Sequence, residues 1–226
     1  MRKLTHSSFF VFFFILLIPL TGSCQTQVVK HTSESMLYDE TMEQALAVRY
    51  ELDQLQFKNG LTNQRSDFRL DPKVTTRTAN PDAFANTGYD RGHLAPFESF
   101  KGNEIGAMES FYMSNVSPQL QHFNRSFWNK LESQLYELLN THPNMVIFSG
   151  PIFIKNGPAV SVNGVTIPDM FFKVAFDRDT HTPIYCILAP HDDYVDDPSQ
   201  YVVPVAYVEA LSHLNFVALD KTLKLK

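Results

Sequence analysis

Apolar and polar residues recur along this chain with two different periods, which predict strands in some segments and helices in others. Residues 46–52, with the sequence Leu-Ala-Val-Arg-Tyr-Glu-Leu, alternate in polarity as a half-buried strand does. Short apolar runs predict further strands, which cover residues 111–116, 145–148, 166–176 and 183–188. We expect Pro118 to mark the end of the first of these runs and Pro168 to interrupt the third.

A helix is predicted over residues 124–139, because apolar side chains recur there at a spacing of 3.6 residues. The face that they form consists of Phe127, Trp128, Leu131, Leu135, Leu138 and Leu139. Asn124 is a suitable N-terminal cap for this helix. A closing helix is predicted over 206–214, whereas residues 59–89 are rich in Asn, Thr, Asp, Pro and Gly and predict a surface loop. The pattern indicates a single α+β domain.

Composition narrows the class of protein. Of the 226 residues, 44% are hydrophobic and 19% are charged, which is enough apolar material for a sizeable core. This excludes a disordered tail, a collagen-like fibre and a coiled coil. The net charge is -5, whereas a basic surface is the usual sign of a nucleic-acid-binding protein. Any case for nucleic acid therefore depends on a local site.

The N-terminus predicts a signal for export. A basic pair precedes an apolar run over residues 9–18, which a proline ends. This run is too short to span a membrane, since a spanning helix takes about 20 apolar residues. We expect residues 1–24 to be the signal peptide, residues 25–44 a tether and residues 45–226 the domain.

Cys24 ends the leader in a sequence that resembles a bacterial lipoprotein signal. The segment Leu-Thr-Gly-Ser-Cys over residues 20–24 is similar to a loose lipobox, from which it departs at Thr21. The resemblance implies a lipidated Cys24 that anchors the protein in the bacterial cell envelope. If Cys24 is an ordinary cysteine, the protein is secreted or periplasmic. Cys186 lies in an apolar strand and is expected to be buried, with a disulfide to Cys24 as the alternative.

Two segments carry polar residues suited to chemistry. In the first, residues 90–96, Gly92 permits a close approach of the backbone and the following His93 can be aimed at an exposed point. In the second, Asn124 and Glu132 are eight residues apart and lie on nearly the same face of the predicted helix. Asn115 stands at a strand end just before them. An imidazole, two amides and a carboxylate could therefore converge.

The first of these segments, Asp-Arg-Gly-His-Leu-Ala-Pro, resembles the signature of the DNA/RNA non-specific endonucleases, the ββα-metal or His-Me finger nucleases. Further matches follow in the same order and cover residues 115–132, 148–153 and 167–174. The resemblance extends over roughly residues 45–218, and an ordered set of this kind is far more specific than one short motif. It implies the ββα-metal fold, a mixed or antiparallel sheet with helices packed on it.

The resemblance also implies a role for each polar residue in metal-assisted phosphodiester hydrolysis. His93 resembles the general base that takes a proton from water. Asn124 resembles the single direct ligand of Mg²⁺, with Mn²⁺ as the alternative metal, since Mg²⁺ keeps most of its waters. Glu132 would hold metal-bound waters, Arg91 would offset charge on the scissile phosphate and Asn115 would orient the cluster.

Two further arginines are implied to bind substrate. Arg65 occupies about the place of a substrate-binding arginine of the family, one residue out of register, and Arg125 adds positive charge beside the metal. The implied partners are the phosphodiester backbones of DNA and RNA. Cleavage would show little sequence preference, because contacts to phosphate carry no base information. Oligomeric state is left open.

Taken singly, each of these residues also fits a purely structural role. A histidine before Leu-Ala-Pro can be structural, Asn124 can be only a helix cap, and Glu132 can be a solvated carboxylate. A second class of function is an envelope lipoprotein that uses the fold as a catalytically silent binding or structural module. Loss of the two basic leader residues, which takes the net charge from -5 to -7, favours that alternative. A third is a nuclease restricted to one substrate, such as single strands.

Two other features bear on the site and its setting. The acidic segment 191–197 could be a cation site, but its composition favours a polar loop before the last helix. His122 is expected on a surface loop. Glycosylation motifs begin at Asn115 and Asn124, and a glycan at either asparagine would block the chemistry. This favours a bacterial envelope over a eukaryotic secretory route.

Overall fold

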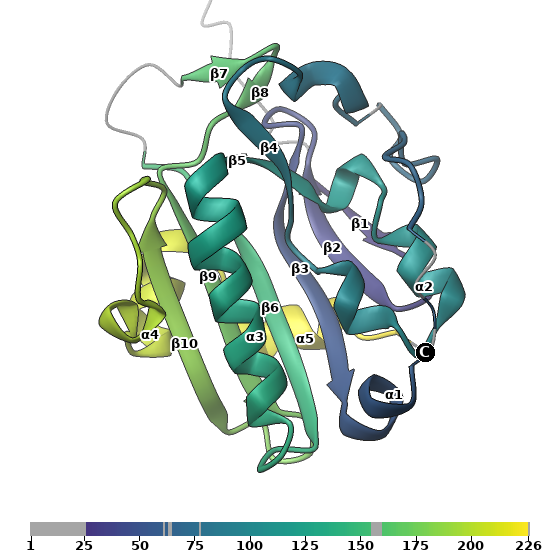
Figure 1. Ribbon diagram of the computed structural model, residues 1–226, viewed down its shortest axis with the longest axis vertical. Helices are drawn as coiled ribbons and strands as arrows, with labels where there is room; N and C mark the ends of the chain where they lie inside the picture. Colours follow the sequence, from purple (N-terminus) through teal and green to yellow (C-terminus); the bar gives the residue numbers. More distant parts are fainter. Residues whose placement is uncertain (1–25, 61, 63–64, 77, 155–159, 226) are drawn as a thin grey trace, which may run out of the picture.

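The strands predicted over 46–52, 145–148, 166–176 and 183–188 correspond to strands that lie in one antiparallel sheet (Figure 1). The computed structural model describes residues 26–60, 62, 65–76, 78–154 and 160–225. In spatial order, the strands of the sheet are β1 (Thr26–Lys30), β2 (Glu34–Asp39), β3 (Gln44–Asp53), β6 (Asn144–Ile152), β9 (Met170–Asp177) and β10 (Pro183–Pro190). The predicted leader, with Cys24, lies outside the described residues.

The remaining elements cover the sheet or connect its strands. A separate ribbon pairs β4 (Tyr89–His93) with β5 (Val116–Leu120), and a small hairpin pairs β7 (Ser161–Val162) with β8 (Val165–Thr166). The helices are α1 (Gln54–Asn59), α2 (Glu104–Glu109), α3 (Asn129–Leu138), α4 (Val205–Ser212) and α5 (Phe216–Leu223). None of the helices in the described part of the chain is long and apolar enough to cross a membrane.

Both faces of the sheet are buried, which explains why its central strands are almost continuously apolar. Phe171 and Ala175 of β9 belong to the core that α3 covers. Their neighbours Phe172 and Val174 point to the other side and pack in the core that α4 and α5 cover. Figure 1 shows α3 and the β4–β5 ribbon on one face of the sheet, with α4 and α5 behind it. The predicted α+β class is therefore confirmed.

Residues 26–44 do not form a tether, contrary to the prediction. Residues 26–39 form β1 and β2, the outer strands of the large sheet, and Met36 and Tyr38 are fully buried. Polar residues obscured this pattern, because Ser35 and Asp39 are also buried. In this segment, polarity along the chain does not report exposure to solvent.

The strand predicted over 111–116 is displaced toward the C-terminus. Met113–Asn115 is a turn of 3₁₀ helix, and β5 begins only at Val116 and continues through Pro118. A proline is tolerated there because β5 pairs with β4 on one side only, so its other edge needs no N–H donor.

The helix predicted over 124–139 begins before Asn124. Phe123–Trp128 forms a π-helical turn that continues into α3, and the backbone at His122 is already helical. Asn124 is therefore inside the helix and does not cap it. Near the C-terminus, the helix predicted over 206–214 corresponds to α4, which ends where His213 adopts a left-handed conformation at φ 57°. A further helix, α5, follows it and was not predicted.

Candidate functional site

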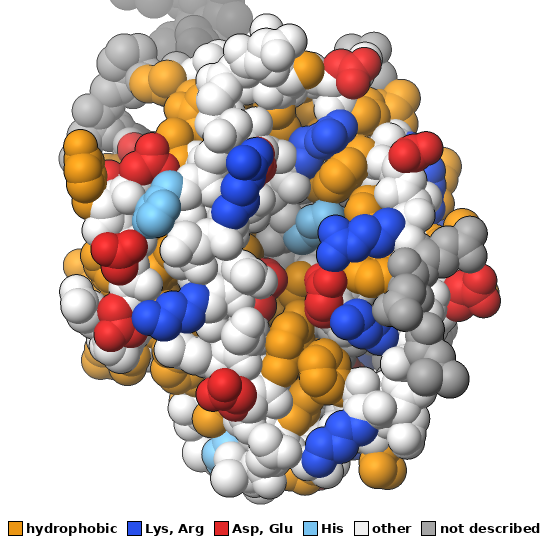
Figure 2. All heavy atoms as spheres, viewed as in Figure 1, with side chains coloured by type: hydrophobic (Ala, Val, Ile, Leu, Met, Phe, Trp, Pro, Cys, Tyr) orange, Lys and Arg blue, Asp and Glu red, His pale blue; other side chains and the backbone are white. Residues whose placement is uncertain are grey.

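A surface pocket of about 280 Å³ lies where the end of β4 meets the π-helical turn before α3. Its lining residues are Arg65, Phe68, Asp90, Arg91, His93, Phe111 and Asn124. Figure 2 shows basic side chains on both sides of a hollow in this part of the molecule. The pocket thus brings together four of the residues singled out from the sequence. Glu132, Asn115 and Arg125 are not part of its lining.

His93 is the last residue of β4, and its imidazole is packed between two aromatic rings. The ring centroids of Phe68 and Phe111 each lie 5.1 Å from that of His93. Its Nε2 atom is buried and has no hydrogen-bond partner among the described residues. Burial, followed by the positive charges of Arg65, Lys173 and Arg91, lowers the pKa of His93 to about 4. At neutral pH the imidazole is therefore uncharged and able to accept a proton.

Gly92 leaves room for a side chain from the neighbouring strand, next to His93. The side chain of Gln119, on β5, occupies the space that a Cβ atom at Gly92 would fill. The close approach at this glycine is therefore made by a side chain of β5 and not by its backbone, contrary to the expectation.

Asn115 is buried below the pocket and holds the backbone that follows His93. Its Oδ1 accepts a hydrogen bond from the Ala95 amide at 2.9 Å, and its Nδ2 donates to the Ala95 carbonyl at 2.8 Å. The same Nδ2 donates to the carbonyl of Ser110 at 2.9 Å. With no exposed surface, Asn115 orients the turn after His93 and does not itself reach the pocket.

Asn124 presents an amide to the pocket from the π-helical turn. Its Nδ2 donates to Oδ2 of Asp90 at 3.0 Å, which fixes the orientation of the amide. No hydrogen bond to its Oδ1 occurs in the described part of the chain, so that oxygen is available to a ligand. Asp90 was not singled out from the sequence except as part of the motif.

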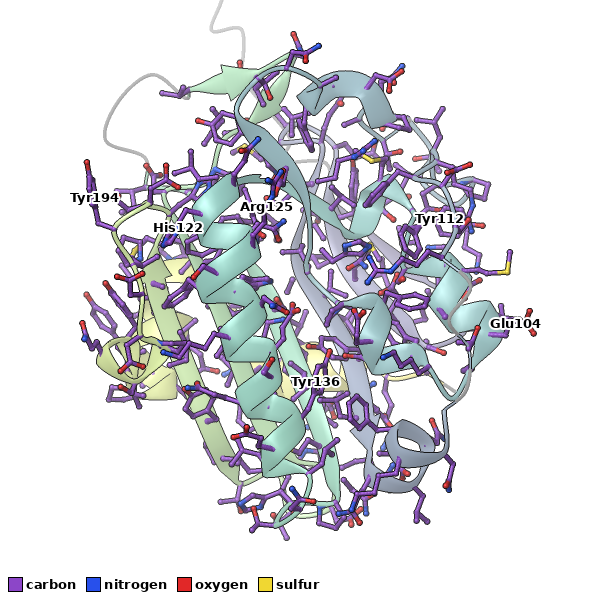
Figure 3. The ribbon with its side chains drawn as sticks, viewed as in Figure 1. Glu104, Tyr112, His122, Arg125, Tyr136 and Tyr194 are labelled. Carbon is purple, nitrogen blue, oxygen red and sulfur yellow. The ribbon has the colours of Figure 1, made fainter. Side chains whose placement is uncertain are left out.

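Arg125 binds the same carboxylate as Asn124. Its Nε and Nη2 atoms each lie 2.7 Å from an oxygen of Asp90. Burial raises the pKa of Asp90, but the hydrogen bonds from Arg125 and Asn124 outweigh it and lower the pKa below its usual range. Figure 3 shows Arg125 between the long helix and the ribbon, with Tyr194 on the far side of that helix. Arg125 was predicted to bind substrate, but part of its positive charge is balanced by Asp90.

The other two arginines line the pocket and lie on aromatic rings. The Arg91 guanidinium lies 4.5 Å from the centroid of Phe68, and Arg65 lies 5.2 Å from that of Phe97. Arg65 also pairs with Glu98 at 2.8 Å, yet 65% of its side chain is exposed. Both guanidinium groups are held near the opening of the pocket with donors left for an anion.

Glu132 lies behind the pocket, where it pairs with a buried lysine that the sequence analysis did not single out. Nζ of Lys173, on β9, is 3.2 Å from Oε1 of Glu132 and 4.5 Å from the ring of Trp128. Burial raises the pKa of Glu132 and lowers that of Lys173, while each charge opposes the effect on the other. The sequence did hold a signal for this pair, since a lysine inside an apolar strand indicates a buried charge, and a buried charge requires a partner.

The remaining polar candidates take part in local structure. His191 Nε2 accepts a hydrogen bond from the Leu120 amide at 2.7 Å, and its Nδ1 lies 3.0 Å from the Pro168 carbonyl. Asp192 and Asp197 accept backbone hydrogen bonds within their own turns. The polar-loop interpretation of segment 191–197 fits these bonds.

Metal ligands of the usual kind do not cluster in the described residues, since no group of three or more His, Cys, Asp or Glu side chains is placed to hold an ion. The pocket instead offers one amide oxygen, Oδ1 of Asn124, beside the Asp90 carboxylate. One oxygen ligand suits Mg²⁺, which retains several waters and takes others from phosphate groups. These residues therefore fit a hydrated divalent cation.

Comparison with known proteins gives one consistent result. The profile of a family described as DNA/RNA non-specific endonuclease matches residues 17–222, which include all the pocket residues. Human mitochondrial endonuclease G is 29% identical over 208 residues, covering 84% of this chain and 69% of that protein. Nuclease C1 of Cunninghamella echinulata var. echinulata is 31% identical over 134 residues, or 54% of this chain and 53% of that protein.

A solved structure shows the same fold. The crystal structure of the EndoG/EndoGI complex, which concerns the mechanism of EndoG inhibition, superposes with a TM-score of 0.74 at 26% identity. The match covers 84% of this chain and 84% of that one. The large sheet and the ribbon that holds the pocket therefore belong to a known architecture.

Proposed function

The chain belongs to the DNA/RNA non-specific endonuclease family, and we propose that it is a metal-dependent endonuclease that hydrolyses phosphodiester bonds in both DNA and RNA. The observation that carries this proposal is the composition of one pocket. There, an uncharged imidazole at His93, a free amide oxygen at Asn124 and a guanidinium at Arg91 share a single opening. A base, an oxygen ligand for a metal and a partner for phosphate are the groups that such hydrolysis needs.

In this proposal His93 is the general base. Its imidazole lines the pocket and is uncharged, so a ring nitrogen would accept the proton of the attacking water molecule. The low pKa of His93 ensures that the ring is free to accept a proton at any pH above about 4. Phe68 and Phe111 keep the ring in place, so little reorganisation is needed when water is activated.

Asn124 would hold Mg²⁺, or Mn²⁺, through its Oδ1 atom, with Glu132 as an acceptor for the waters of the ion. A divalent ion bound there would polarise the phosphate and stabilise the departing 3′ oxygen. Asp90 fixes the amide by accepting from Nδ2, which turns Oδ1 away from that carboxylate. Because Asp90 is also bound to Arg125, its negative charge is partly balanced before any ion arrives.

Arg91 and Arg65 would bind the phosphodiester backbone. Both line the pocket, and each has an aromatic ring on one side that limits the motion of its guanidinium. Contacts of this kind recognise phosphate and carry no base information, which supports cleavage with little sequence preference. Arg125 would contribute only residual positive charge, because Asp90 occupies two of its donors.

The test uses the purified protein with supercoiled plasmid and with total RNA, first in Mg²⁺ and then in EDTA. We expect degradation of both substrates that requires the metal. The variants His93→Ala and Asn124→Ala should lose roughly 100-fold or more in rate, the usual size of one electrostatic or acid–base contribution. A folded protein that cuts nothing across Mg²⁺, Mn²⁺ and pH would instead support the silent binding module.

We also propose that the protein is exported and anchored to the bacterial envelope through a lipidated Cys24. The support is the sequence of residues 1–24 alone, with its apolar run and its lipobox-like end. Metabolic labelling with a fatty acid should mark the full chain and not its Cys24→Ser variant. Recovery of the protein without fatty-acid label, in the soluble periplasmic or secreted fraction, would favour an ordinary signal peptide over a lipoprotein signal.

A further inference from the structure

Three consecutive residues that begin with His93 have their backbone fixed by side chains from other elements. Nε1 of Trp128 donates to the His93 carbonyl at 3.1 Å, and Nζ of Lys173 donates to the Leu94 carbonyl at 3.1 Å. Asn115 bonds both backbone groups of the next residue, Ala95. The residues at and just after the end of β4 are thus held from the π-helical turn, from β9 and from the 3₁₀ turn before β5.

Lys173 also contacts Glu132, the residue proposed to hold waters of the metal ion. The same ammonium group lies 3.2 Å from Glu132, on α3, and 3.5 Å from the hydroxyl of Tyr50. The residue is 1% exposed. One buried cation therefore joins the turn that carries the general base to the helix that carries Asn124 and Glu132.

We propose that Lys173 is a positioning residue for the reaction, which sets the place of His93 relative to α3 by bonding the Leu94 carbonyl and Glu132 at once. The inference rests on the proposed function, because it assigns Lys173 a role in that same hydrolysis. Lys173 itself does not line the pocket. Its effect passes through the backbone of Leu94 to the adjacent imidazole.

The other fully buried cation of the described chain shows what a purely structural role is like. Arg49, on β3, is 1% exposed and pairs with Asp220 at 2.7 Å and with Glu51 at 2.8 Å. Asp220 belongs to α5, behind the sheet and away from the pocket. Arg49 therefore satisfies two carboxylates and bonds no residue of the site, whereas Lys173 makes one of its bonds to a backbone carbonyl next to the base.

The test separates positioning of His93 from simple neutralisation of Glu132. We compare Glu132→Gln with the double variant Glu132→Gln/Lys173→Met, in the full protein. Both variants lack the carboxylate charge of Glu132. They differ because only the double variant also loses the hydrogen bond from Lys173 to the Leu94 carbonyl. Removing both members of a buried ion pair commonly leaves a protein folded, whereas removing one member is destabilising, so urea unfolding would verify that both variants are folded. We expect kcat to fall by about 100-fold between the two, the scale of a misplacement of about 1 Å, with KM little changed.

The matched control is Arg49→Met/Asp220→Asn, which also removes a buried ion pair. It should keep the wild-type kcat. Equal kcat values for Glu132→Gln and its Lys173→Met derivative would overturn the proposal, since Lys173 would then only balance a charge. A fall in kcat of similar size in the Arg49 control would also overturn it, because loss of any buried pair would suffice.

A measurement that does not depend on activity separates this proposal from the proposed function. The ¹H–¹⁵N signals of the His93 ring, assigned with His93→Ala, should shift when Lys173→Met is added to Glu132→Gln and stay unchanged in the Arg49 control. If the wild-type protein cuts no nucleic acid, the proposed function fails. The ring signals then still decide whether Lys173 positions His93, and unshifted signals contradict it.

Discussion

At the scale of single residues, the proposed hydrolysis depends on His93 being neutral. Its imidazole lies between Phe68 and Phe111 and faces a pocket that also holds Arg65 and Arg91. A buried ring near positive charge is costly to protonate, because burial and repulsion both oppose a second charge. The residue therefore stays in the form that a general base requires, well below the pH at which an exposed histidine would become charged.

The first prediction concerns pH. Burial, with Arg65, Lys173 and Arg91, lowers the pKa of His93 to about 4, so kcat/KM should hold from neutral pH down to about 5 and fall as pH drops through 4. The sign follows because activity needs the unprotonated ring. Initial rates of plasmid cleavage at constant ionic strength would measure this, with near-ultraviolet circular dichroism to confirm folding at each pH. Half-maximal kcat/KM near pH 6.5 in folded protein would contradict it.

At the scale of elements, the β4–β5 ribbon and the π-helical turn before α3 set the geometry of the pocket. The ribbon ends at His93, and the turn presents Asn124 opposite it. A π-helical turn places side chains differently from a regular helix and often occurs at functional positions. Close pairing within the ribbon depends on Gly92, because the side chain of Gln119 fills the space beside it.

The second prediction concerns this contact. Gly92→Ala should lower the free energy of unfolding by about 1–3 kcal/mol, as overpacking does, and should reduce kcat because His93 is the next residue. Adding Gln119→Ala should restore both, since it removes the atoms that the new Cβ meets. The amide of Gln119 has no hydrogen-bond partner in the described chain, so this second change breaks no hydrogen bond. Urea unfolding and cleavage rates would measure the rescue, and its absence would argue against the contact.

At the scale of the whole molecule, an acidic protein is proposed to bind a polyanion. The net charge is -5, so attraction to nucleic acid must come from the few basic residues at the pocket. Arg65 and Arg91 line it, while Arg125 is engaged by Asp90. Binding should therefore depend on a small number of phosphate contacts.

The third prediction follows from that count. For the His93→Ala protein and a DNA duplex, the logarithm of the association constant should fall against the logarithm of salt concentration with a slope of about -2. Arg65→Gln should reduce the slope by about 1, because it removes one phosphate contact. Arg178→Gln is the matched control, since that arginine pairs with Glu51 and does not line the pocket. Fluorescence anisotropy would measure the slopes, and a value near about -6 would indicate a far larger basic surface.

The sequence by itself determined the class of fold, the position of its central strands and the family. The runs at 145–148 and 166–176 are apolar because both faces of their strands are buried, so local composition was sufficient to find them. The ordered motifs that begin at Asp90 could also be identified from the sequence, because the residues of each motif are close neighbours along the chain. His93 and Asn124 do meet in one pocket, as their place in those motifs implied.

Only the tertiary structure decided what surrounds these residues. Lys173 meets Leu94 across 79 positions of sequence, and Arg125 meets Asp90 across 35. No periodic pattern reports such contacts, because they depend on how distant elements pack. For the same reason β1 and β2 were mistaken for a tether, since burial of their polar residues depends on distant elements: Ser35, for example, donates to the carbonyl of Leu223. The pattern of polar and apolar residues reports local periodicity, whereas the burial of a side chain and its contacts with distant residues depend on the whole folded chain.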